Sequence, residues 1–200
     1  MALAAARPGW AVGFEDETWW SRVSPPAVRS WATAGPLRLV AQEAPRGEPK
    51  ALACYGLLVR APDADGAPTE EAWLRFVDGR PRGILTTAFL DWCCAKLAAA
   101  ARTALVLIWD NASWHLSREV RRWLGEHNRR AHREGGVRIV PCFLPVKSPW
   151  LNPIEPKWTH GQRRIVEPAR LLTAREVEER VRAALGCAVH DHLAIPHEVA

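Results

Sequence analysis

The chain has 200 residues, of which 48% are hydrophobic and 24% charged; these proportions fit one globular domain and exclude a disordered, collagen-like or coiled-coil chain. The net charge is +5, and residues 1–100 carry 11 basic and 11 acidic side chains, which leaves 16 basic (27 − 11) and 11 acidic (22 − 11) for residues 101–200. Because the whole excess lies in the second half, nucleic acid is a candidate partner.

Cysteine usage and the N-terminus indicate a cytoplasmic protein. The five cysteines include no C-x-x-C pair, which favours a reduced chain without structural zinc. The first residues lack the basic region of a signal peptide. The longest apolar stretch, 84–109, is interrupted by charged residues, so we expect no membrane span.

The first half of the chain predicts strands joined by loops. Apolar runs bounded by Pro, Gly and Asp are typical of buried strands, and the first run ends directly at Glu15, Asp16 and Glu17. We expect strands over 10–14, 51–60 and 73–77, a turn region over 61–68, and a long loop from Pro25-Pro26 to about residue 50.

The second half predicts helices that alternate with strands. Ser117 is a candidate N-cap, Gly135-Gly136 a helix stop, and Thr173-x-x-Glu176 a capping box. Together with the first half, this order predicts an α/β fold with a mixed sheet flanked by helices. We expect helices over 86–102, 117–134, from Asn152-Pro153 and from 173, and strands over 104–109 and 137–144.

Three acidic residues occupy positions that suit chemistry. Asp16 and Asp110 each follow a predicted strand, and Glu155 lies in the first turn of a predicted helix. If the two strands are neighbours, their acids converge at one sheet edge. Clustered carboxylates repel one another unless a cation compensates, and oxygen ligands favour Mg²⁺ or Mn²⁺.

Each acid also has a purely structural interpretation. Asp16 would then be a solvated strand end, and Asp110 would form an Asx turn with Asn111. Glu155 would complete a capping box with Asn152.

Three segments resemble the DDE transposases of the IS630 group, relatives of Tc1/mariner. They are residues 13–20 (GFEDETWW), 109–115 (WDNASWH) and 144–158 (LPVKSPWLNPIEPKW), and the similarity extends from about Trp10 to Ile165. The resemblance implies an RNase H-like fold in which Asp16, Asp110 and Glu155 hold two Mg²⁺ or Mn²⁺ ions. It further implies cleavage at transposon ends and attack of a 3′-hydroxyl on target DNA.

The resemblance also sets expectations about domains and partners. Members of the group carry helix-turn-helix domains before the catalytic domain, whereas we expect only a short remnant or linker over 1–9 and one catalytic domain over 10–200. Recognition of transposon ends is then either supplied by a separate helix-turn-helix chain or lost by truncation. We expect a homo-oligomer on DNA in the bacterial nucleoid. The 44 residues (155 − 110 − 1) between Asp110 and Glu155 indicate a subgroup with a longer insertion.

Several residues near the acids are candidates for DNA contact, although basic runs are also typical of solvated helix faces. His115 is expected near the scissile phosphate or a metal, or as a positioning hydrogen-bond partner. Trp150 and Trp158 suit either base stacking or packing. The candidates are His115, Lys147, Lys157, His160, Arg163, Arg164, Arg121 and Arg122.

Two other functions stay open beside that of a transposase catalytic domain. One is a structure-selective nuclease of the RNase H-like class, and the other is a decayed fragment that binds DNA without catalysis. Strand-transfer products would distinguish a transposase from a structure-selective nuclease. DNA binding without metal-dependent cleavage would indicate a decayed fragment.

Overall fold

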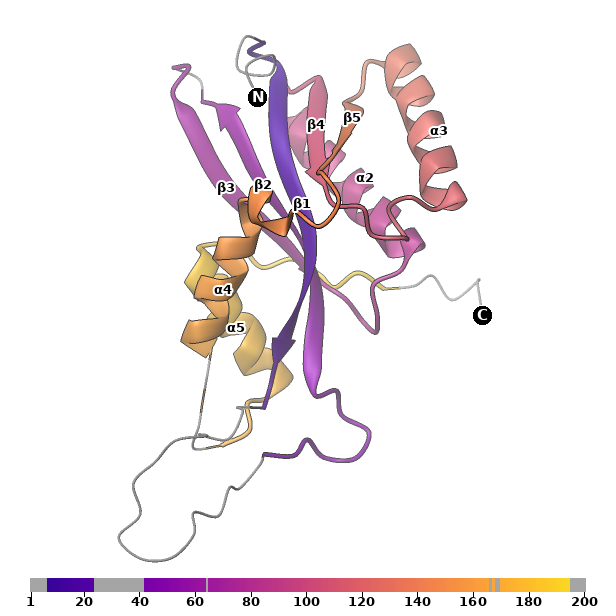
Figure 1. Cartoon of the computed structure of the whole chain (residues 1–200). Helices are drawn as coiled ribbons and strands as arrows, with labels where there is room; N and C mark the ends of the chain where they lie inside the picture. The colour runs from indigo at the N-terminus through magenta and orange to yellow at the C-terminus, as the bar shows by residue number, and fades with distance from the viewer. Residues whose placement is uncertain (1–6, 24–41, 64, 166, 168–169, 195–200) are drawn as a thin grey trace, which may run out of the picture.

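A computed structural model describes residues 7–23, 42–63, 65–165, 167 and 170–194; most of the expected loop between residues 25 and 50 lies outside this part. A five-stranded sheet runs in the order β3-β2-β1-β4-β5 (Figure 1). Its strands are β1 (Trp10–Ser21), β2 (Ala51–Pro62), β3 (Pro68–Phe76), β4 (Ala104–Trp109) and β5 (Arg138–Phe143). The helices are α2 (Gly83–Ala99), α3 (Arg118–Glu134), the 3₁₀ turn η1 (Pro149–Leu151), α4 (Ile154–Ile165) and α5 (Ala174–Leu185).

The central strand β1 is longer than its sequence predicts. It pairs antiparallel with β2 as far as Ser21, but parallel with β4 only as far as Phe14. The strand expected over 10–14 therefore does not end at the acids, because β2 continues to satisfy its backbone hydrogen bonds. Glu15, Asp16 and Glu17 lie inside β1, at the point where β4 stops pairing with it.

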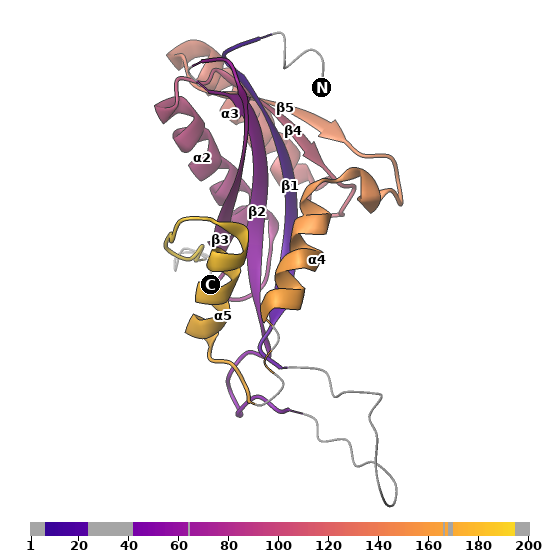
Figure 2. The ribbon, with the colours of Figure 1, turned by 90° about the vertical axis from the view of Figure 1, so that its left-hand side faces the viewer.

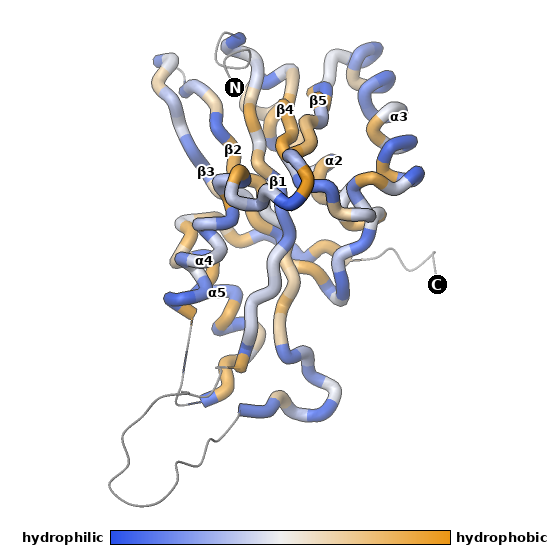
Figure 3. Tube along the Cα trace, viewed as in Figure 1, coloured by the Kyte–Doolittle hydropathy of each residue, from blue (hydrophilic) through white to orange (hydrophobic). Residues whose placement is uncertain are grey.

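Helices cover both faces of the sheet. One hydrophobic cluster packs α2 and α3 against one face, and a second packs α4 and α5 against the other (Figures 1 and 2). In Figure 3, hydrophobic segments concentrate in the strands, whereas much of α3 is hydrophilic. Side chains alternate along a strand, so Glu15 and Glu17 point to one face of the sheet and Asp16 to the other. The residues of β2 paired with the two glutamates, Leu57 and Tyr55, belong to the cluster packed against α2 and α3, whereas Asp16 contacts α4.

The predicted helix ends are confirmed. The Ser117 hydroxyl accepts a hydrogen bond from Val120 N at 3.2 Å, and α3 ends at Gly135, whose φ of 78° lies in the left-handed region. Thr173 and Glu176 form the capping box of α5. By contrast, α2 begins at Gly83, three residues before the predicted start.

Helix α4 docks on the sheet through two tryptophans and two glycines. The rings of Trp20 and Trp158 meet edge to face, with centroids 5.7 Å apart. A Cβ atom on Gly161 would lie 2.8 Å from the Trp20 ring, and one on Gly56 of β2 would overlap the Trp158 ring. The missing side chains therefore let α4 approach the sheet closely.

We predict that Gly56→Ala destabilises the protein. The added methyl group meets the Trp158 ring inside a packed cluster, where overpacking costs about 1–3 kcal/mol. Urea unfolding followed by circular dichroism measures the change. Gly125→Ala is the control, because its nearest foreign atom is 3.7 Å away and alanine in a helix is expected to add about 0.5–1 kcal/mol. Equal stability of Gly56→Ala and the wild type would contradict this packing.

The segment after α5 is held to the sheet by His192. Its Nδ1 lies 2.7 Å from Asp78 Oδ1 and its Nε2 lies 3.0 Å from Glu178 Oε1. Partial burial alone would lower the pKa of His192, but the hydrogen bonds to these two carboxylates outweigh burial and raise the pKa. The neighbouring Leu193 forms a β-bridge with Val77.

We predict a pH-dependent contribution of His192 to stability. A histidine whose pKa is raised by folding stabilises the protein fully below its unfolded pKa of about 6.5, and this stabilisation is lost as the pH rises through the folded pKa. The difference in unfolding free energy between the wild type and His192→Gln should therefore shrink as the pH increases above about 6.5. A difference for His192→Gln that stays flat as the pH rises would refute the prediction.

Candidate active site

The three predicted acids meet at one edge of the sheet. Phe14 and Ile108 form the last pair between β1 and β4, and Asp16 and Asp110 lie two residues further along each chain, on the same face. Glu155 lies in the first turn of α4, which packs on that face. Its charge raises the pKa of Asp16, and the charge of Asp110 raises the pKa of Glu155. The structure thus places the three acids within range of one another's charges, although their ligand atoms are not as close together as those of Glu15, Glu17 and His115.

Asp16 is the most buried of the three. Burial raises its pKa to about 7, and the charges of Glu155 and Glu17 act in the same direction. A hydrogen bond from Trp158 Nε1 to Asp16 Oδ2, 2.8 Å long, partly opposes this increase. The same bond ties the first acid to the helix that carries the third.

Asp110 is half-exposed and ionised. Its Oδ1 accepts a hydrogen bond from Ala112 N at 2.9 Å, so the Asx-turn geometry is present. His115 Nδ1 lies 2.9 Å from the same oxygen, and this hydrogen bond is the main reason why the pKa of Asp110 is lowered. The Asx turn therefore orients Asp110 and leaves its second oxygen for another ligand.

Glu155 does not complete a capping box. Asn152 Oδ1 accepts from Ile154 N at 3.4 Å, and no hydrogen bond to the Glu155 carboxylate occurs within the described ranges. Partial burial raises its pKa, with Asp110 as the second cause. Its carboxylate is thus available to a cation at the edge of the sheet.

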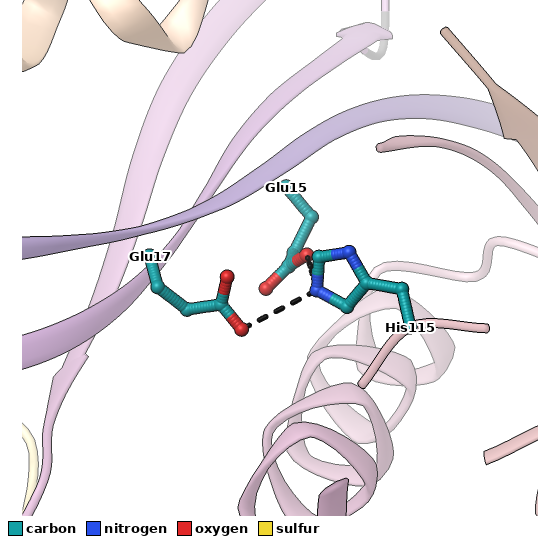
Figure 4. Close-up of side chains that lie close together, drawn as sticks. All are labelled: Glu15, Glu17 and His115. Atoms are coloured by element: carbon teal, nitrogen blue, oxygen red, sulfur yellow. Dashed lines mark hydrogen bonds and ion pairs between the residues drawn. The ribbon is translucent and has the colours of Figure 1, made fainter. Parts of the chain in front are cut away.

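His115 lies between three carboxylates, those of Glu15 and Glu17 (Figure 4) and that of Asp110. Its Nε2 is 3.3 Å from Glu17 Oε1 and 3.4 Å from Glu15 Oε2, and its ring stacks on Trp109. Burial alone would lower the pKa of His115, but hydrogen bonds to Asp110 and Glu17 and the charge of Glu15 raise it to about 10. His115 is therefore an imidazolium at neutral pH.

The cluster of Glu15, Glu17 and His115 is a second group of metal-type ligands. Their ligand atoms all lie within 4.8 Å of one another. From the sequence, Glu15 and Glu17 are neighbours of Asp16 that could tune it or substitute for it. The two-residue period of a strand is the signal that places them together on the other face. His115 Nδ1 lies 2.9 Å from Asp110 Oδ1, and its Nε2 lies between the carboxylates of Glu15 and Glu17. We therefore interpret the cluster as an ionic network that positions Asp110.

The donors on the α4 side fit a hard divalent cation. Asp16, Asp110 and Glu155 offer only carboxylate oxygens, which are the ligands that Mg²⁺ and Mn²⁺ prefer. The mutual repulsion that raises the pKa values of Asp16 and Glu155 would be relieved by a bound cation. The carboxylate ligands and their mutual repulsion therefore make the site suitable for Mg²⁺ or Mn²⁺.

The candidates for DNA contact divide by exposure. His115 is 1% exposed, which favours its positioning role over contact with a phosphate. Lys157 forms an ion pair with Glu70 at 2.7 Å. Lys147 is exposed in the loop before α4 with a φ of 58°. The remaining candidates are exposed: His160, Arg163, Arg164, Arg121 and Arg122.

A hollow of about 540 Å³ lies beside Glu155. Trp150, His160 and Arg163 contribute to its walls. Trp150 is 73% exposed, whereas Trp158 is buried and bonded to Asp16. Packing therefore accounts for Trp158, and of these two tryptophans it is Trp150 that offers a face for stacking.

Comparisons with known proteins identify the family of this chain and proteins that share its fold. The family model for the DDE superfamily endonuclease matches residues 68–178, which is 111 of the 200 residues (178 − 68 + 1) and includes Asp110 and Glu155. The search of curated proteins found no match. No helix in the described part is long and apolar enough to cross a membrane.

Solved structures of Mos1 transposase share the fold. A paired-end complex with the left transposon end matches with a TM-score of 0.58 and 16% identity, over 94% of this chain and 53% of that one. The Mos1 strand transfer complex matches with a TM-score of 0.56 and 14% identity, over 94% and 52%. The chain thus spans about half the length of these proteins.

The RNase H-like fold and the resemblance to a Tc1/mariner-related DDE catalytic domain are confirmed, while the IS630 group stays a prediction. The catalytic roles of Asp16, Asp110 and Glu155 are likewise predictions. The family match extends over more than half of the chain, and the chain therefore belongs to the DDE superfamily endonuclease family.

Proposed function

We propose that the chain is the catalytic domain of a DNA transposase, with residues 10–200 as one domain. It cleaves phosphodiester bonds at transposon ends and joins 3′-hydroxyl ends to target DNA, with Asp16, Asp110 and Glu155 holding two Mg²⁺ or Mn²⁺ ions. The observation that carries this proposal is the meeting of three carboxylates, from β1, the end of β4 and α4, at one sheet edge.

Each acid has a defined part in holding the ions. When bound, divalent ions supply an activated oxygen nucleophile and stabilise the leaving oxygen. Asp16 is oriented by Trp158, Asp110 is kept ionised by His115, and Glu155 has an uncommitted carboxylate. The exposed Arg163 and His160 follow Glu155 on α4, where they suit contact with a DNA backbone.

The relatives support this function. The family is one of endonucleases. The solved structures that match this chain include a Mos1 paired-end complex with Mn, which matches with a TM-score of 0.52 and 15% identity over 90% of this chain and 49% of that one. DNA as substrate and a divalent ion as cofactor follow from these relatives for the proposed activity. A separate helix-turn-helix chain and a homo-oligomer on DNA stay predictions.

We predict that the acids bind Mn²⁺. Calorimetry on Asp110→Asn and Glu155→Gln should show Mn²⁺ affinity at least about tenfold weaker than the wild type, since each loses a charged ligand. Glu126→Gln removes one exposed carboxylate from α3 and should bind Mn²⁺ like the wild type. Unchanged affinity in both site variants would reject the proposed centre.

Activity distinguishes the transposase from its alternatives. With Mn²⁺, the wild type should nick supercoiled plasmid, and Asp110→Asn should not. Joining of a labelled duplex with free 3′-hydroxyl ends to the plasmid supports a transposase, whereas nicking without joining supports a structure-selective nuclease. Binding of DNA without any metal-dependent cleavage would identify a decayed fragment.

A further inference from the structure

A basic pocket lies at the opposite end of β4 from Asp110. It encloses about 670 Å³, and its lining includes five basic side chains and no carboxylate. These side chains come from three separate parts of the chain: the start of β1, the last turns of α3 and the start of β5. They are Arg7, Arg129, His132, Arg133 and Arg138.

The pocket is a fixed part of the fold. Trp10, Ala104 and Arg138 form one row across β1, β4 and β5. The Asn128 side chain bonds both backbone groups of Ile139, at 2.7 and 2.8 Å, and so holds α3 against the edge of β5. The arginines are therefore presented on a rigid frame.

The positive charge of the pocket is not neutralised by nearby acids. Arg129, Arg133 and Arg138 are exposed and form no ion pair with any described residue. His132 and Arg133 also suit the negative end of the α3 dipole, but this accounts for neither Arg7 nor Arg138. Arginines on one concave surface without acidic partners match a row of phosphates.

The pocket and the acidic centre share one open face of the sheet. Arg138, Val140 and Cys142 are exposed and pair with Ala104, Val106 and Ile108, whose face continues to Asp110. No carboxylate lies among these sheet residues. Six residues separate Ala104 from Asp110, about 20 Å at about 3.3 Å per residue, which is roughly six base pairs of B-form DNA.

We propose that this pocket binds the phosphate backbone of duplex DNA, and that the duplex crosses the open face of β4 and β5 to reach the acidic centre. The part of this inference that leads the duplex to the acidic centre rests on the proposed function. Binding at the pocket itself depends on charge and needs no metal.

Salt-dependent DNA binding tests the pocket. Anisotropy of a labelled 30-base-pair duplex, measured in EDTA between 50 and 200 mM salt, compares the wild type with Arg129→Gln/Arg133→Gln/Arg138→Gln. Each lost phosphate contact should reduce the slope of log K against log salt by about 0.9, so we expect a reduction of roughly two to three and at least about tenfold weaker binding at 0.1 M salt.

The control removes the same charge elsewhere. Arg80→Gln/Arg170→Gln/Arg175→Gln lies outside the pocket, on exposed positions, and should bind DNA like the wild type. Equal affinity and slope for the two triple variants would overturn the proposal. Unchanged Mn²⁺ binding by the pocket variant, measured without DNA, shows that the fold and the acidic centre are intact.

Cys142 tests the path. It is exposed on β5 between the pocket and Asp110, whereas Cys54, Cys93 and Cys94 are buried and Cys187 lies beyond α5. Saturating duplex should slow maleimide labelling of Cys142 at least about fivefold and leave Cys187 unchanged. Bound DNA that leaves Cys142 labelling at the free rate would refute the path. Failure of metal binding or nicking, with this protection intact, would overturn only the proposed function.

Discussion

The site depends on the indole of Trp158. Its ring occupies the space that Gly56 leaves on β2 and meets the edge of Trp20, while its N–H donates to Asp16. One side chain therefore fixes the distance of α4 from the sheet and the orientation of the first acid. Because Glu155 lies one turn before Trp158 on the same helix, this packing also places the third acid.

The second constraint is electrostatic. Five carboxylates gather around β1 and the end of β4, and their repulsion and burial raise the pKa values of Glu15, Asp16 and Glu155. His115 neutralises the side that faces α2 and α3, where Glu15 is buried. On the α4 side no described basic side chain forms an ion pair with Asp16 or Glu155, so a metal cation is the natural counter-charge there.

Alternation along β1 separates these two roles. Glu15 and Glu17 face one way and Asp16 the other, so adjacent residues belong to an ionic network and to the proposed metal site. The basic pocket adds a third region at the far end of the same strands. Acidic, neutral and basic parts thus follow one another along the open face of β4 and β5.

Much of this arrangement could be predicted from the sequence. The caps at Ser117 and Thr173 follow from local patterns. The grouping of Asp16, Asp110 and Glu155 follows from the family resemblance and from the condition that the strands before the first two acids are neighbours, which the pairing of β1 with β4 meets. The length of β1 could not, because pairing with β2 is a tertiary contact. The pairing of His115 with Glu15 and Glu17 and the assembly of the basic pocket from three segments also depend on packing that no local pattern encodes.

The most direct measurement is a crystal structure of the protein soaked in Mn²⁺, with anomalous scattering used to locate the metal. The account predicts an anomalous peak among the carboxylates of Asp16, Asp110 and Glu155, on the α4 side of the sheet. A peak held by Glu15, Glu17 and His115, or no peak at saturating Mn²⁺, would contradict it.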